Sequence, residues 1–106
     1  MLYDNNRWDK QVKTANPVRD LLVAARAKVS AGWCQGGFQK DGRYCMLGAM
    51  YAVSSNIFVL NDALYALARA VGLNDATDTD VVRWNDVRGR TQAEIVAGFD
   101  RAIAAL

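Results

Sequence analysis

The feature that most constrains the fold is a glycine-rich segment at residues 32–49, which reads GWCQGGFQKDGRYCMLGA. It holds both cysteines, one of the three tryptophans and five of the eight glycines. Glycine adopts backbone conformations that other residues avoid, and aromatic rings fill large, rigid volumes. We therefore expect this segment, called the hub, to be the part around which the other elements pack.

A β-hairpin is predicted inside the hub. Asp41 and Gly42 form a pair typical of a type I′ turn, in which both central residues need a positive φ. This turn pairs residues 38–40 with residues 43–45 and places Gln39 opposite Tyr44. Because so short a hairpin is only marginally stable alone, it must pack against helices.

The first and the last helix have clear start signals. Asn16 followed by Pro17 is typical of an N-cap and a first helical residue, and Gly32 ends this helix as its C′ residue. Thr91 and Glu94 form a capping box, in which each side chain accepts a hydrogen bond from the backbone of the other residue. The apolar residues that follow each start recur every three or four positions, so each helix has one buried face.

The chain between these two helices is also mainly helical. A helix is expected over residues 46–53, where Gly48 and Ala49 leave room for another helix or for Trp33 to approach closely. Residues 57–60 are expected to be a short apolar connector. The next predicted starts are Asn61 or Asp62 for a helix to residue 71, and Thr79 or Asp80 for one turn that carries Trp84.

These patterns predict a mainly α fold: a small single domain of four to five helices around a short central β-hairpin. The length of 106 residues fits one domain, and the hydrophobic fraction of 52% is typical of a globular chain. Residues 16–106 are expected to form this helical domain. Residues 1–15 carry only isolated apolar side chains, so we expect an N-terminal arm that becomes ordered where Trp8 or Tyr3 docks.

Charge and hydropathy restrict the class of partner and the location that we expect for this protein. Residues 1–53 carry eight Lys or Arg and four Asp or Glu, residues 54–106 carry five and seven, and the net charge is +2. This is a mild asymmetry and does not favour a polyanionic partner. No N-terminal signal sequence and no run of about 18 apolar residues is present, so we expect a cytoplasmic protein with no membrane partner. In that reducing compartment both cysteines are expected to be thiols.

Several short motifs resemble a known family. They are GWCQG at 32–36, CMLGA at 45–49, WNDVRGRTQAE at 84–94 and FDRAI at 99–103. In their order and spacing they resemble a family of small bacterial and phage proteins that is described only as a domain of unknown function. The resemblance covers residues 16–106. It implies a small stand-alone intracellular domain of bacterial or phage origin, and it supplies no catalytic residues.

The cysteines favour a structural interpretation. A cysteine nucleophile normally needs a base such as histidine, and this chain has no histidine. Structural zinc needs four ligands, so Cys34 and Cys45 would require a second copy to complete a site. We expect no metal and no cofactor, and interpret both residues as small buried hydrophobes. If Cys45 were exposed at its helix N-terminus, its pKa would be lowered and it would be reactive.

Residues 84–91, WNDVRGRT, have two interpretations. In the structural one, Trp84 lies in the core, Asn85 or Asp86 bonds to backbone in a tight turn, and Gly89 has a positive φ. In the functional one, Asp86, Arg88 and Arg90 form a polar cluster near Gln35 that holds a phosphate or carboxylate. The nearby acidic residues at 75, 78 and 80 lack the pattern of a calcium loop and are expected to be solvated.

Three functions follow, in order of preference. The first is a non-enzymatic binding module for an unknown protein partner, of which a phage or mobile-element inhibitor of a host defence system is one concrete version. The second is a small-molecule-binding domain or small enzyme, and the third is a weak nucleic-acid binder through the arm and the first helix. The oligomeric state stays open.

Each function has its own candidate residues. The partner-binding surfaces are the arm, with Tyr3, Arg7, Trp8, Lys10 and Lys13, and the polar rim of the hub, with Trp33, Cys34, Gln35, Asp86, Arg88 and Arg90. The alternative pocket is lined by Trp33, Tyr44, Trp84, Cys34, Asp86 and Arg90, with Gln35 beside them. The nucleic-acid surface adds Arg19 and Arg26 to the basic residues of the arm.

Overall fold

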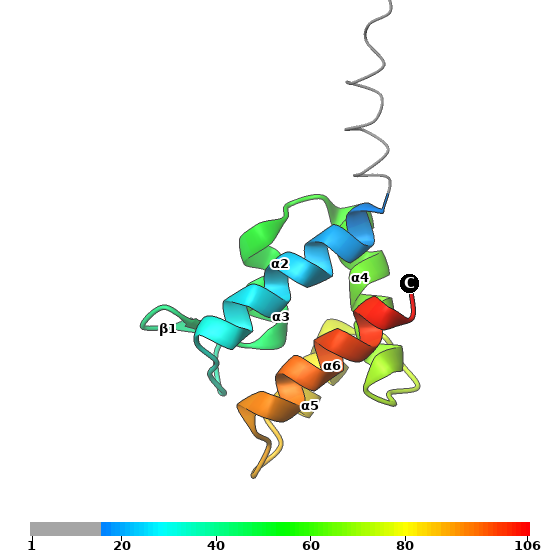
Figure 1. The fold of residues 1–106 in the computed structure, drawn as a ribbon. Coiled ribbons are helices and arrows are strands. Elements are labelled where there is room, and N and C mark those ends of the chain that lie inside the picture. The colour runs from blue at the N-terminus through cyan, green and yellow to red at the C-terminus, as the bar shows by residue number, and fades with distance from the viewer. Residues whose placement is uncertain (1–15) are drawn as a thin grey trace, which may run out of the picture.

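Five helices and one two-stranded hairpin make up residues 16–106, the part of the chain that the computed structural model describes (Figure 1). This confirms the predicted mainly α fold. The predicted arm surface of Tyr3, Arg7, Trp8, Lys10 and Lys13 lies outside the described residues. The elements are α2 (Pro17–Ala31), β1 (Gln39–Lys40), β2 (Arg43–Tyr44), α3 (Met46–Val53), α4 (Ile57–Ala70), α5 (Asp78–Asn85) and α6 (Gln92–Ala104).

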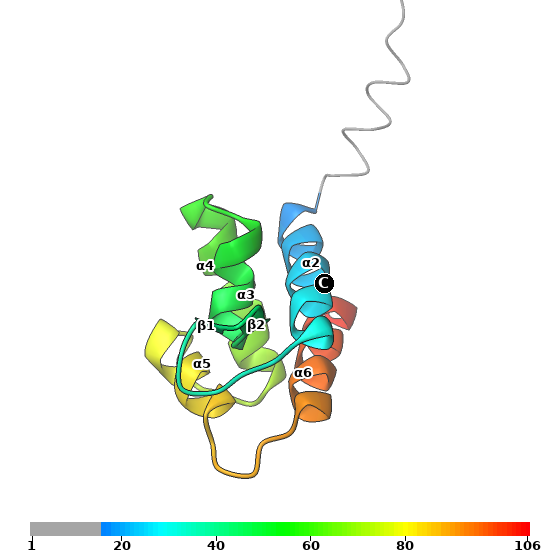
Figure 2. The ribbon, with the colours of Figure 1, turned by 90° about the vertical axis from the view of Figure 1, so that its left-hand side faces the viewer.

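The helices pack in two layers. Helices α2 and α6 lie side by side in one layer, and α3, α4 and α5 form the other (Figure 2). Helix α2 contacts α3, α4 and α6, so it joins the two layers. The apolar face of each helix points between the layers, because that is where it escapes water. The largest fully buried side chains there are Phe99, Leu22, Met46, Leu47, Met50, Leu67, Ile95, Val29 and Val81.

The start signals of α2 and α6 are confirmed. The side chain of Asn16 accepts a hydrogen bond from the amide of Arg19, and Pro17 occupies the first turn of α2. At α6, Thr91 Oγ1 accepts from the amide of Glu94, and Glu94 Oε1 accepts from the amide of Thr91. Both signals were predictable because capping uses residues only three positions apart.

Two of the predicted helix starts are wrong. Helix α4 begins at Ile57, since the Asn56 side chain accepts from the amides of Phe58 and Val59. Residues 57–60 are therefore its first turn and not a connector. Helix α5 begins after Thr77, whose Oγ1 accepts from the Asp80 amide, and it makes two turns instead of one. In both cases a polar residue earlier in the sequence accepts hydrogen bonds from the free amides of the first turn. None of the helices in residues 16–106 has the length and apolar character needed to cross a bilayer.

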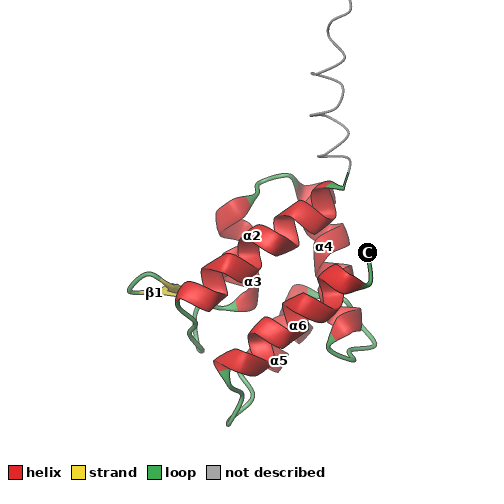
Figure 3. Cartoon of the chain, in the orientation of Figure 1, coloured by secondary structure: helices red, strands yellow, loops and turns green. Residues whose placement is uncertain are grey.

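The hairpin has the predicted turn and register. Asp41 and Gly42 have φ values of 51° and 78°, and Gln39 pairs with Tyr44. The short strand β1 is drawn in yellow in Figure 3. The hairpin lies at one edge of the helices and is largely exposed. Its second strand is held from the other side, where the amide of Tyr44 donates to the carbonyl of Gly32 over 3.0 Å.

Two glycines of the hub serve close approach. Gly32 follows α2 with an extended backbone, φ −174°, and not in the left-handed form expected of a C′ glycine. A Cβ atom there would lie 2.9 Å from Cγ of Arg43. A Cβ atom on Gly48 would lie 2.0 Å from the carbonyl oxygen of Phe38. The neighbour of Gly48 is therefore the backbone of the hub, and not another helix or Trp33 as predicted.

Candidate functional site

Asn85, the last residue of α5, is the polar centre against which the hub packs. Its side chain is fully buried and makes four hydrogen bonds. Oδ1 accepts from Nε1 of Trp33 over 2.8 Å and from the amide of Met46 over 3.1 Å. Nδ2 donates to the carbonyl of Cys34 over 3.2 Å and to Oδ1 of Asp86 over 2.9 Å. These four bonds use the full capacity of the amide group, so Asn85 fixes the end of α5 against both ends of the hub.

Gln35 and Asp86 extend this network, as the functional interpretation expected them to be neighbours. Nε2 of Gln35 donates to the carbonyls of Asn85 and Val87, each over 3.0 Å. Oδ1 of Asp86 accepts from the amide of Gly36 over 3.1 Å. Nε2 of Gln35 and Oδ1 of Asp86 are therefore bonded to the protein's own backbone, and they position the loop at 35–37.

Arg88 and Arg90 do not join this cluster. The guanidinium of Arg90 lies 3.7 Å from the ring centre of Trp84, and its Nε donates to the carbonyl of that residue. Its Nη1 lies 3.4 Å from Oε2 of Glu94. The hydrogen bond from the Thr91 amide, helped by Arg90, lowers the pKa of Glu94. Arg88 is exposed.

Both cysteines lie in protected positions. Cys34 is 6% exposed and Cys45 is 2% exposed. The Cys45 thiol caps α3, where its Sγ accepts from the amide of Gly48 over 3.2 Å. Burial raises the pKa of Cys45, and this outweighs the lowering by the helix amides. Sγ of Cys34 lies 3.6 Å from the carbonyl of Gly37, so this thiol also faces backbone.

The two tryptophans and Asp86 of the predicted pocket are partly buried. Trp33 and Trp84 are half-buried, and Trp33 is bonded to Asn85. Asp86 of the predicted pocket lines a cavity together with Phe38 and Val82. Within residues 16–106, no three His, Cys, Asp or Glu side chains gather in a way that fits a metal ion.

The basic residues predicted for nucleic acid are only partly available. Arg26 forms a two-pronged ion pair with Asp100, in which Nη2 lies 3.3 Å from Oδ2. Arg19 is exposed near the start of α2. One of the two described candidate cations is therefore paired within the protein.

An exposed apolar surface next to the hub was missed by sequence reasoning. Phe38, Tyr51 and Ile57 are 54%, 44% and 63% exposed. The rings of Phe38 and Tyr51 meet edge to face, with centres 6.3 Å apart. Tyr51 and Ile57 line a cavity of about 250 Å³, while Phe38 and Val82 line another of about 230 Å³. We call Phe38, Tyr51, Ile57 and Val82 the apolar face.

Acidic side chains border the apolar face. The hydroxyl of Tyr51 donates to Oδ2 of Asp78 over 2.7 Å, and this bond raises the pKa of Tyr51 to about 12. Asp86 lies in the cavity of Phe38 and Val82. Asp78 and Asp86 therefore place two carboxylates at the border of the face. A signal for the face exists in the sequence, since Ile57 is a large apolar residue directly after the cap at Asn56.

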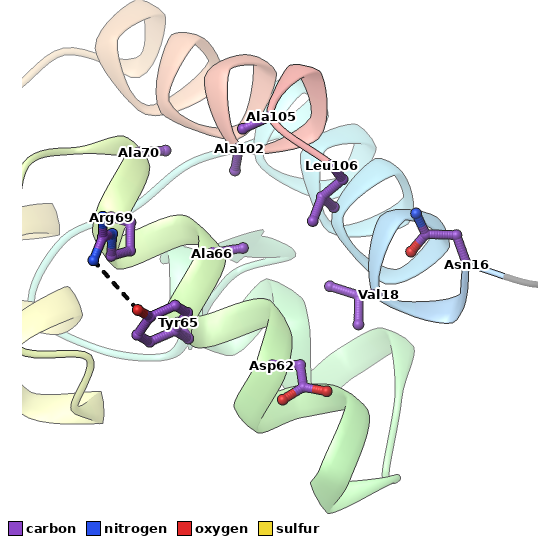
Figure 4. Close-up of a pocket in the computed structure, with 10 residues that line it drawn as sticks. All are labelled: Asn16, Val18, Asp62, Tyr65, Ala66, Arg69, Ala70, Ala102, Ala105 and Leu106. Atoms are coloured by element: carbon purple, nitrogen blue, oxygen red, sulfur yellow. Dashed lines mark hydrogen bonds between the residues drawn. The ribbon is translucent and has the colours of Figure 1, made fainter.

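A second groove lies on another side of the domain, between α2, α4 and α6 (Figure 4). Its volume is about 730 Å³. Nη1 of Arg69 donates to the hydroxyl of Tyr65 over 3.3 Å at its rim. The lining residues are Asn16, Val18, Asp62, Tyr65, Ala66, Arg69, Ala70, Ala102, Ala105 and Leu106.

Comparison with known proteins identifies the family. A model of a family of unknown function, DUF6197, matches residues 13–105. The chain belongs to this family. No curated protein and no solved structure matched the chain. The DUF6197 match includes the hub, the apolar face and almost the whole second groove, whereas residues 1–12 precede it.

Proposed function

We propose that this DUF6197 protein is a non-enzymatic module that binds a protein partner through the apolar face. The observation that carries the proposal is the edge-to-face pair of Phe38 and Tyr51, which stands exposed between two cavities. Exposed aromatic side chains beside shallow cavities are typical of the anchor points of protein interfaces. Single apolar residues are common on surfaces, but four that adjoin one another form a patch.

The charges around the face favour a particular partner chemistry. Asp78 lies in the cavity of Tyr51 and Ile57, and Asp86 lies in the cavity of Phe38. A partner that inserts apolar side chains there meets carboxylates at the edge of the contact. We therefore expect an apolar segment flanked by lysine or arginine, since opposite charges at an interface rim steer association and set register.

The hub has a supporting role in this proposal. Gln35 and Asp86 hold the loop at 35–37, and Phe38 follows this loop directly. The carbonyl of Phe38 accepts from the amide of Cys45 over 3.2 Å, which fixes its backbone. A side chain on a fixed backbone loses less conformational entropy on binding, so the hub prepares Phe38 for its partner.

The experiment is site-specific photo-crosslinking in cells that produce the protein, followed by binding measurements with the purified partner. A photoreactive residue at Phe38 is expected to capture one partner, and the same residue at Val23 is the control. Val23 is 44% exposed, as Tyr51 is, but it lies on α2 outside the face. Capture from both positions alike, or from neither, contradicts the proposal.

Binding of the captured protein then tests the face itself. Phe38→Ala and Ile57→Asp are expected to weaken the Kd by about 10-fold or more, the effect of losing an anchor residue. Val23→Ala is expected to leave the Kd unchanged. Far-UV circular dichroism and the thermal midpoint check that each variant is folded, which is expected because both residues are more than half exposed.

The identity of the partner tests the finer part of the proposal. We further propose a bacterial or phage origin, for which the resemblance of the motifs at 32–36, 45–49 and 84–94 is the support. A role as an inhibitor of a host defence system is one concrete version of the proposed partner binding. A captured component of a defence system, inhibited by the wild-type protein and not by Phe38→Ala, agrees with that role. A captured metabolic enzyme whose activity is unchanged contradicts the inhibitor role but leaves the binding function in place.

A further inference from the structure

The groove between α2, α4 and α6 is separate from the apolar face and from the hub. The floor of the groove includes small or aliphatic side chains from all three helices, among them Val18, Ala66 and Ala102 (Figure 4). Tyr65 and Leu106 stand at its edges and are 55% and 49% exposed. The volume of about 730 Å³ is large enough for an aromatic side chain with its neighbours. Such a groove leaves apolar area in contact with water unless something covers it.

We infer that the groove binds Trp8 of the same chain. Asn16, the first described residue, itself lines the groove, so the preceding segment begins at the groove's edge. Trp8 lies eight positions before Asn16, and an extended chain of that length reaches about 26 Å. From Asp62 to Ala70 the groove follows α4 over about 12 Å, so Trp8 can reach every part of it.

The composition of residues 1–15 fits the groove. Trp8 is the largest apolar side chain there, and an indole buries up to about 250 Å² of surface. Asp62 and Arg69 place one negative and one positive charge on the rim of the groove. Trp8 is likewise bordered by both signs, with Arg7 before it and Asp9 and Lys10 after it. Opposite charges are therefore available to pair at the rim once the indole is seated.

The test is fluorine NMR of the full chain labelled with 5-fluorotryptophan. The chain has three tryptophans, and Trp8→Phe assigns the resonance of Trp8. In the native protein this resonance is expected to differ from its position in urea and to lose most of the shift that exposed fluorine shows between H2O and D2O. The resonances of Trp33 and Trp84 report at the same time whether the domain is folded.

A blocking variant connects this signal to the groove. Ala66→Glu places a bulky charge on the groove floor and is expected to move the Trp8 resonance to its exposed position, with Trp33 and Trp84 unchanged. Ala93→Glu is the matched control, because Ala93 is an exposed alanine of α6 outside the groove. If Ala66→Glu disturbs the fold, Leu106→Asp makes the same test at an exposed edge residue.

Two results overturn the inference. The first is a Trp8 resonance in the native chain that coincides with its position in urea and has the same chemical shift in every groove variant. The second is a Trp8 resonance that moves toward the exposed position on dilution, since this means that the groove takes the segment of a second copy. Neither result bears on the proposed partner-binding function, because Phe38 and Ile57 lie outside this groove and stay unchanged.

Discussion

The polar network at the hub and the apolar face lie next to each other, yet the first is closed by internal hydrogen bonds and the second is exposed to solvent. At the contact between the hub and the end of α5, Gln35 of the hub and the neighbouring Asn85 and Asp86 bond to the protein itself, and within residues 16–106 every buried side-chain nitrogen and oxygen has a partner. On the apolar face, Phe38 and Ile57 are more than half exposed. The polar side chains at the hub therefore build a scaffold, whereas apolar side chains, including Phe38 of the hub itself, stay available for binding.

The largest effect is expected at Gly48, where the scaffold is tightest. In Gly48→Ala the new Cβ would lie 2.0 Å from the carbonyl oxygen of Phe38. The backbone at Phe38 must therefore move away, and its carbonyl loses the hydrogen bond from the amide of Cys45. We expect a loss of about 4 kcal/mol in the free energy of unfolding, measured by urea denaturation.

The control for Gly48 is Gly37→Ala. There the nearest atom is Cε of Lys40 at 3.1 Å, which belongs to a flexible exposed side chain. We expect a cost below about 1 kcal/mol. Equal stability of Gly48→Ala and wild type would mean that the hub is as adaptable as the apolar face, and the comparison would fail.

Asn85→Ala should have the next largest effect. It leaves Nε1 of Trp33 and the amide of Met46 buried without an acceptor, and each such loss costs about 1–3 kcal/mol. We expect a loss of about 3 kcal/mol and a change in near-UV circular dichroism from Trp33. The control Asn74→Ala changes an exposed loop residue and should stay within about 0.5 kcal/mol.

Thiol labelling measures whether the hub is closed. Because Cys34 and Cys45 are 6% and 2% exposed, alkylation at neutral pH should be about 100-fold slower in the native protein than in urea. Raising of the Cys45 pKa by burial slows that residue further, since the thiolate is the reactive form. An added thiol at exposed Ala52, Ala52→Cys, should react at the rate of the unfolded chain. Rapid modification of native Cys34 would show an open hub and favour a ligand pocket.

Local chemistry explains which parts of the fold were predictable. The caps at Asn16 and Thr91 and the turn at Asp41 and Gly42 depend on residues within four positions, so the sequence contains the whole signal. The start of α4 was misplaced because both Asn56 and Asn61 have the chemistry of a cap, and packing of Val59 and Leu60 against the core favours Asn56. Local signals alone do not include that packing.

The site was harder to predict because it depends on contacts far apart in the chain. The structural interpretation of residues 84–91 correctly gave Gly89 a positive φ, observed at 87°, but it placed Trp84 in the core, where only part of the ring is buried. That Asn85 reaches Trp33 across 52 positions has no local signal. The apolar face likewise joins the hub to α3, α4 and α5, and only the fold brings these together.

The smallest predicted effect concerns the titration of Tyr51, which belongs to the apolar face. Tyr51 is exposed, but its hydrogen bond to Asp78 raises its pKa to about 12, so its ring is held in place for a partner. A spectrophotometric titration of wild type, with that of Tyr51→Phe subtracted, should show this tyrosine ionising near pH 12. Asp78→Asn should bring the value down toward the usual 10, whereas Asp75→Asn should leave it unchanged.

The same bond gives a weak pH dependence of stability. The pKa of Tyr51 is higher in the folded chain than in the unfolded one, so the stabilisation is fully present below pH 10 and is lost as the pH rises toward 12. Because the side chain is partly exposed, we expect under about 1 kcal/mol, seen as a thermal midpoint that falls less steeply above pH 10 in Asp78→Asn than in wild type. Circular dichroism at each pH confirms that the fold persists. A Tyr51 that titrates near 10 in wild type would mean that its ring is free, and the apolar face would then need its partner to order it.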